Sequence, residues 1–151
     1  ITVVASYTDG GGTAESLTSA ETAAVGNVND IPTGAVTITG TASQGETLTA
    51  DVSAIADLDG LGSNGFSYQW KADGSNIADA KASTLVLSQD LVGKAISVTA
   101  SFTDGGGTAE SFTSAATSAV TNSNDSPTGN VTITGTATQG QTLTADTSAI
   151  A

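Results

Sequence analysis

The chain has 151 residues, a length that allows one or two domains, and 38% of its side chains are hydrophobic but only 4% aromatic. Its formal net charge is −12, and its only cations are three lysines, so it lacks the positive surface that nucleic-acid binding requires. Cys, Met and His are absent, which excludes thiol nucleophiles, disulfides, the usual zinc sites and the commonest general base. We therefore expect no enzymatic activity. No apolar run approaches the roughly 20 residues of a membrane span, so we expect no membrane insertion.

The first segment of the chain returns 95 residues later. Residues 1–15 read ITVVASYTDGGGTAE, and residues 96–110 read ISVTASFTDGGGTAE. The match continues without a gap to the last residue, and 43 of the 56 paired positions are identical. Self-similarity at a fixed spacing is typical of repeat architectures, so we predict tandem repeats of 95 residues.

Two copies of a polar motif separate the predicted repeats. NVNDIPTG at 27–34 and NSNDSPTG at 122–129 gather Asn, Asp, Pro and Gly, and apolar alternation stops in both. We therefore divide the chain into the C-terminal part of one repeat (1–29), a complete repeat (30–125) and the N-terminal part of the next (126–151). The chain opens within a strand-like pattern, so we take it as an excerpt of a longer protein. Neighbouring repeats of the same chain, or other copies of the molecule, would supply the partner strands that the end segments lack.

Short alternating segments with turn residues between them predict an all-β fold for the complete repeat. In chain order we expect strands at 35–40, 46–52, 66–71, near 76–78, and at 84–87, 95–103 and 108–120. The last two form a hairpin through DGGG at 104–107, where glycine adopts positive φ without a side-chain penalty.

The period, the short strands and the turn spacing together fit an Ig-like antiparallel β-sandwich. Alternation in the strand at 66–71 places three aromatic side chains on one face, namely Phe66, Tyr68 and Trp70. We expect a core that contains Leu48, Trp70, Leu85 and Val98.

Acidic and amide side chains from three segments should meet at one end of this sandwich. In an Ig-like fold, the loop after the second strand and the loop of the last hairpin lie at the same end, where the linker enters. Ca²⁺ takes oxygen ligands from carboxylates and amides, and it would relieve the repulsion between the carboxylates. We therefore expect a Ca²⁺ site formed by Asn29, Asp30, Asp57, Asp59 and Asp104, with Asp9, Asn124 and Asp125 as the equivalents in adjacent repeats.

The same residues have simpler interpretations. Asp-x-Asp-Gly and Asn-Asp are ordinary turn formers, whose side chains bond the nearby backbone. Glu15 and Glu110 either cap the acidic cluster or are solvated strand residues. The glycines at 105–107 are followed by no helix or lysine, so they predict a hairpin turn rather than a phosphate site.

Two strings carry a resemblance to a known family: FSYQWKADGSNI at 66–77 and STLVLSQDLVGKAISVTASFTDGGGTAES at 83–111, followed by N-x-N-D-x-P. They resemble the Ig-like repeats of giant bacterial surface adhesins, including those secreted with RTX tails, and the resemblance covers the whole chain. The Cys pair of antibody-type domains is missing, although Trp70 stands where that architecture places its core tryptophan. The resemblance implies an extracellular extender region, in which many copies hold a distal binding domain away from the bacterial cell.

Two functions are compatible with these observations. The first is a passive spacer for cell adhesion and biofilm formation, in which stacked sandwiches form a rod and calcium stiffens each linker. The second is a repeat of a self-assembling extracellular filament or sheath, in which segments 1–29 and 126–151 pair with other molecules. A glycan-binding module would need aromatic side chains on its loops, and no predicted loop carries one.

Overall fold

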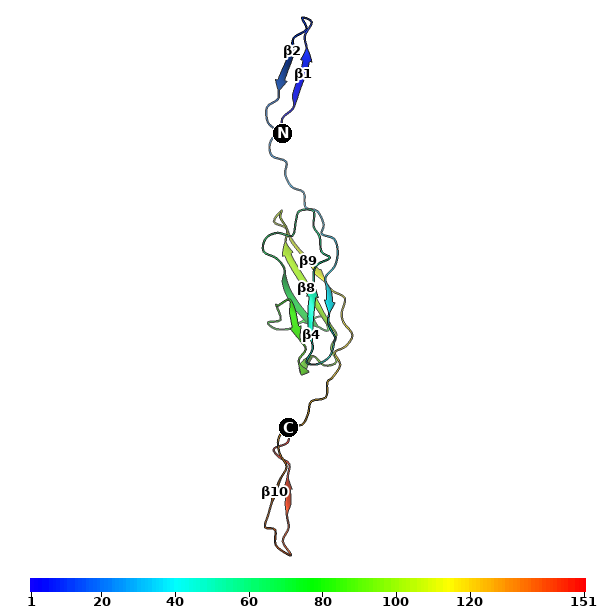
Figure 1. Cartoon of the computed structure of the whole chain (residues 1–151), viewed down its shortest axis with the longest axis vertical. Helices are drawn as coiled ribbons and strands as arrows, with labels where there is room; N and C mark the ends of the chain where they lie inside the picture. The colour runs from blue at the N-terminus through cyan, green and yellow to red at the C-terminus, as the bar shows by residue number, and fades with distance from the viewer.

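The computed structural model describes all residues, 1–151, and strands are its main secondary structure. A first hairpin, a central pair of sheets and a second hairpin follow one another along the long axis (Figure 1). The one helix is the short 3-10 turn Gln89–Leu91, and no helix is long and apolar enough to cross a membrane. The predicted all-β fold class with antiparallel sheets is confirmed.

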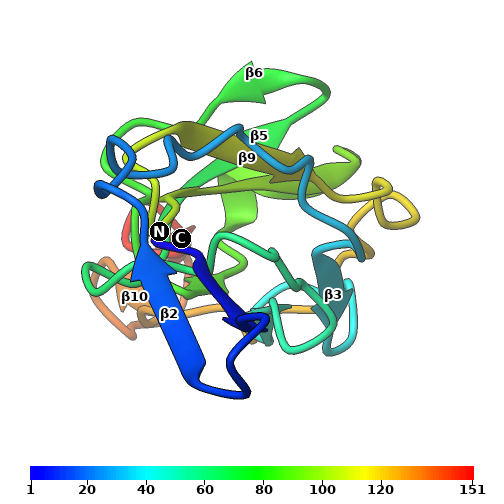
Figure 2. The ribbon, with the colours of Figure 1, turned by 90° about the horizontal axis from the view of Figure 1, so that it is seen from above.

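Two antiparallel sheets build the central part of the chain. The first has the order β3-β4-β7, formed by Thr37–Thr39, Thr47–Asp51 and Thr84–Val86. The second has the order β6-β5-β8-β9, formed by Ser75–Asn76, Ser67–Ala72, Ile96–Thr103 and Ala109–Thr113. Seen down the long axis, β5, β6 and β9 lie in one layer and β3 lies in the other (Figure 2). The arrangement is consistent with a β-sandwich.

The core lies between the two sheets, because alternate side chains of both sheets point into it. Its largest fully buried side chains are Trp70, Leu48, Leu87, Ile96 and Val98. The indole Nε1–H of Trp70 donates to the carbonyl of Ala82 at 2.9 Å, which satisfies the one polar atom of this side chain.

One predicted core residue lies nearer the surface than expected. Leu85 pairs with Leu48 but is only partly buried, because β7 is an edge strand of its sheet. Leu87, one residue beyond the end of β7, is the leucine of this segment that is almost completely buried.

The last predicted strand is shorter than expected, because a bulge follows β9. The backbone N–H of Ser114 donates to the carbonyl of Val98, and that of Thr117 donates to the carbonyl of Ile96. The chain therefore advances three residues after β9 while β8 advances two, which is the extra residue of a bulge. The hydroxyl oxygens of these two residues accept the N–H groups of Val98 and Ile96. Side-chain contacts therefore replace part of the strand ladder after Thr113.

The two flanking hairpins have the registers of their counterparts in the centre. In the first, β1 (Val4–Thr8) pairs with β2 (Ala14–Thr18) as β8 pairs with β9, 95 residues on. In the second, β10 (Thr132–Thr134) pairs with β11 (Thr144–Asp146) as β3 pairs with β4. Neither hairpin has a facing sheet, so every residue of these strands is exposed.

Candidate metal centre

Three aspartates meet at the end of the sandwich where the linker from the first hairpin enters, next to Asp30 of that linker. Asp57 and Asp59 lie in the loop between β4 and β5, and Asp104 begins the turn between β8 and β9. One carboxylate oxygen from each lies within 4.8 Å of the others. These three residues, the acidic cluster, are brought together by loops that are some 45 residues apart in sequence (104 − 59).

One oxygen of each loop-initiating aspartate holds the local turn. Asp57 Oδ1 accepts the backbone N–H of Asp59 at 2.8 Å, and Gly60 continues the turn with a φ of +84°. Asp104 Oδ1 accepts the backbone N–H of Thr108 at 2.7 Å, across the glycine turn. The turn-forming role that the sequence suggested is therefore present, and it uses only half of each carboxylate.

The other oxygen of each of these two carboxylates has no partner. Asp57 Oδ2 and Asp104 Oδ2 are buried without a hydrogen bond, and they are the only buried side-chain N or O atoms in that condition. Asp104 is only 4% exposed. Burying an anionic oxygen without a partner costs free energy, and a nearby like charge adds to the cost.

A divalent cation fits this donor set. The available ligand atoms are all oxygens, which suit hard ions such as Ca²⁺ rather than metals that prefer nitrogen or sulfur. Asp57, Asp59 and Asp104 would supply the carboxylate ligands, and the ion would offset the repulsion among them.

Close contact between the two loop backbones brings the carboxylates together. A Cβ on Gly105 would lie 2.2 Å from the carbonyl oxygen of Asp59, and one on Gly62 would lie 2.1 Å from that of Thr103. The backbone N–H of Gly105 donates to Gly60 at 3.1 Å. Glycine is required at these two positions because any side chain would separate the loops.

The linker contacts the acidic cluster through a backbone N–H group, not through the side chains that we expected to be metal ligands. Asp30 donates its backbone N–H to Asp59 Oδ2 at 2.8 Å, and its own carboxylate is not part of the cluster. Asn29 donates its Nδ2–H to Glu110 Oε1 at 3.1 Å. Of the five predicted ligands, the structure therefore brings together the carboxylates of three.

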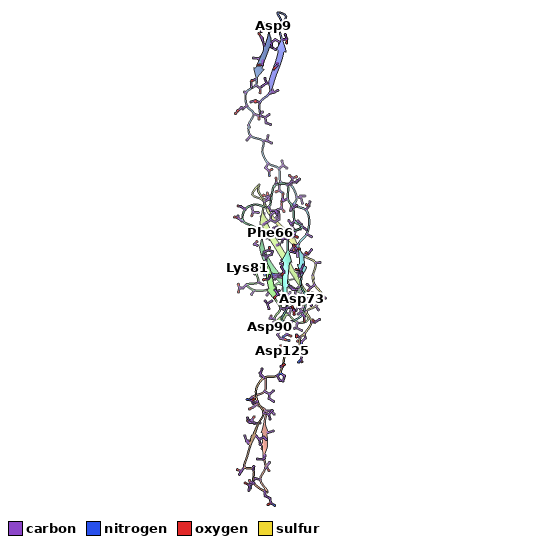
Figure 3. The ribbon with its side chains drawn as sticks, in the orientation of Figure 1. Asp9, Phe66, Asp73, Lys81, Asp90 and Asp125 are labelled. Atoms are coloured by element: carbon purple, nitrogen blue, oxygen red, sulfur yellow. The ribbon has the colours of Figure 1, made fainter.

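The predicted equivalents lie elsewhere. Asp9 stands at the tip of the first hairpin (Figure 3), where its Oδ1 accepts the backbone N–H groups of Gly11 and Thr13. Asp125 lies beyond the opposite end of the sandwich, and Asn124 donates its Nδ2–H to the carbonyl of Asp125. Asp9 keeps the turn-forming role of Asp104 but has no carboxylate neighbours to form a second acidic cluster.

Sequence reasoning missed two participants at this end. For Glu110 the sequence allowed two roles, a cap of the acidic cluster or a solvated strand residue. The contact of Glu110 with Asn29 spans 81 residues, so no local pattern could reveal it. Sequence reasoning also missed the backbone N–H of Asp30, because residue type gives no information about a main-chain donor.

No protein-family model matches this chain, and no curated protein or solved structure matches it either.

Proposed function

We propose that this chain is a stretch of a structural spacer of a bacterial cell-surface adhesin, built from Ig-like repeats and stiffened by Ca²⁺ where each linker enters a repeat. The observation that carries the proposal is the pair of buried, unpartnered oxygens of Asp57 and Asp104 beside that linker. An oxygen-binding cation at this place would stabilise the sandwich and the joint together.

The strand arrangement supports the Ig-like part of the proposal. A three-stranded sheet faces a four-stranded sheet, and the core tryptophan Trp70 comes from β5, the third strand of the sandwich. The flanking hairpins have the registers of their central counterparts, which supports a repeated unit of 95 residues.

The hydrogen bond between Asp59 and Asp30 links the ion to the linker. Asp59 belongs to the acidic cluster, and its Oδ2 accepts the backbone N–H of Asp30. Without a cation, repulsion between the carboxylates would spread the two loops and move the acceptor of this bond. Calcium would therefore determine how firmly the linker is held, and through it the reach of the whole array.

A self-assembling filament remains the second candidate, because the flanking hairpins expose faces that the sandwich buries. Ile96 and Leu48 are 0% exposed, whereas the matching Ile1 and Leu143 are 77% and 47% exposed. Unpaired edges and uncovered apolar faces are templates for pairing with another molecule. In this reading, other copies cover β1–β2 and β10–β11.

One experiment separates the two functions. Small-angle scattering with light-scattering mass determination would be recorded on the chain in calcium and in EGTA, over a range of protein concentrations. The spacer predicts a monomer throughout, with a larger maximum dimension in calcium. The matched control is Asp104→Asn, whose scattering should not respond to calcium. A mass that grows with protein concentration would favour the filament, and identical wild-type curves in calcium and EGTA would refute a calcium-dependent joint.

A further inference from the structure

Two glutamines hold the second linker at the far end of the sandwich. Gln44 accepts the backbone N–H of Ser123 on Oε1 at 3.2 Å and donates from Nε2 to Asp125 Oδ2 at 2.9 Å. Gln89 donates from Nε2 to Asn122 Oδ1 at 3.3 Å. The two bonds of Gln44 require opposite ends of its amide, so together they fix its orientation. We call Gln44 and Gln89 the amide clamp.

The first linker contacts the sandwich that follows it. Asp30 donates its backbone N–H to Asp59 Oδ2, and Asn29 donates to Glu110 Oε1. Asn27 lies against the glycine turn, since a Cβ on Gly106 would be only 2.7 Å from Asn27 Nδ2. These contacts involve the sandwich end that carries the acidic cluster.

The two linkers are the same motif, 95 residues apart, so their contacts can be combined. The carboxylate of Asp125 accepts a hydrogen bond from the sandwich that precedes its linker, whereas the backbone N–H of the matching Asp30 donates to the sandwich that follows. Likewise, Asn122 Oδ1 accepts a hydrogen bond from the preceding sandwich, and Nδ2 of the matching Asn27 lies against the following one. The two sets of contacts use different atoms, so one linker can make both.

We propose that the Asn-x-Asn-Asp linker is a two-sided connector, and that the amide clamp is the surface of each repeat that receives the linker of the next. This inference rests on the proposed repeat array. It adds a binding surface at the end of the repeat opposite the acidic cluster, with a linker Asn and Asp as its ligand. Each linker is then bound by side-chain amides of the repeat that precedes it and by Asp59 of the repeat that follows it.

The differences between the two linkers agree with this assignment. The three positions whose side chains make the contacts are identical in both linkers: Asn27 and Asn122, Asn29 and Asn124, Asp30 and Asp125. Within Asn-x-Asn-Asp, the one position that differs is Val28 or Ser123, and Ser123 contributes only a backbone N–H to the clamp. Gln44 itself returns as Gln139, whose side chain makes no hydrogen bond in this chain.

Amide hydrogen exchange measured by NMR on the whole chain tests the clamp. Gln44→Ala should make the Ser123 amide exchange about tenfold faster, because that N–H loses its acceptor. The matched control is Gln139→Ala, which should leave Ser123 unchanged. The Thr108 amide, at the other end of the sandwich, reports that Gln44→Ala is still folded.

A second variant decides the outcome if Gln44→Ala also speeds exchange at Thr108. Gln44→Glu keeps the size of the side chain and an acceptor for Ser123, but it turns a carboxylate toward Asp125, so residues 122–125 should gain mobility in ¹⁵N relaxation. Equal Ser123 exchange in Gln44→Ala and Gln139→Ala would overturn the connector, as would an unaltered linker in Gln44→Glu. A Ser123 response in a chain that binds no calcium would support the clamp while refuting the metal centre.

Discussion

In two aspartates of the acidic cluster, the two carboxylate oxygens have different roles. In Asp57 and Asp104, one oxygen closes a local turn and the other is buried without a partner. Asp9 matches Asp104 in sequence and also closes its turn, but it lies on an exposed hairpin. The turn role is therefore a property of the local sequence, and the role in the cluster depends on the fold around it.

Asp57→Asn should change the stability of the chain in opposite directions with and without calcium. Asparagine keeps an Oδ1 acceptor for the turn but removes one charge from the cluster. In EGTA the lost repulsion should raise the melting temperature by roughly 5 °C, for about 1 kcal/mol. In calcium the lost ligand should lower the melting temperature relative to the wild type, as measured by calorimetry.

Asp9→Asn is the control for this pair of measurements, since it changes a matching turn outside the cluster. It should shift the melting temperature of the sandwich little in either buffer. Two results would contradict the assignment of the cluster: a destabilised Asp57→Asn variant in EGTA, or equal effects of the two substitutions in calcium.

The sequence predicted which carboxylates converge better than it predicted how the linker reaches them. Asp57, Asp59 and Asp104 could be grouped because an Ig-like topology places their loops at one end. The orientation of Asp30 could not be predicted, because its backbone rather than its side chain makes the contact with Asp59. The clamp residue Gln44 gave no signal, since a glutamine in a polar turn is ordinarily solvated.

Among the secondary-structure elements, the acidic cluster depends on two loops that touch through their backbones. Gly105 and Gly62 permit this contact, and the turn between β8 and β9 was predicted from its glycines alone. The strand predicted for 108–120 was wrong after Thr113. There, the hydroxyl groups of Ser114 and Thr117 accept backbone N–H groups of β8. A bulge of this kind depends on tertiary contacts that strand alternation does not encode.

Gly105→Ala should destabilise the chain by about 1–3 kcal/mol and weaken calcium binding, because the new methyl group pushes the loops apart. The matched control is Gly10→Ala, at the equivalent position of the first hairpin, where nothing lies within 4 Å of the new Cβ. Chemical denaturation of both variants in calcium measures the difference. Equal free energies of unfolding would show that the close approach of the two loops does not matter.

Across the whole molecule, one pair of facing sheets stands between two hairpins that have no facing sheet (Figure 1). Only the sandwich contains the full acidic cluster, because the first hairpin carries Asp9 alone and the second carries no counterpart of Asp104. We therefore predict one bound calcium ion in a chain that carries two copies of the linker motif. In the proposed array, a repeat would bind an ion only when both loops belong to the same folded unit.

Isothermal titration of the calcium-free chain with Ca²⁺ measures directly how many ions the chain binds. We predict one saturable site per chain, with a dissociation constant on the order of 10⁻⁴ M. The heat should disappear in Asp104→Asn and persist in Asp9→Asn. No saturable binding by the wild-type chain, or the same isotherm in Asp104→Asn, would contradict a calcium site at the acidic cluster.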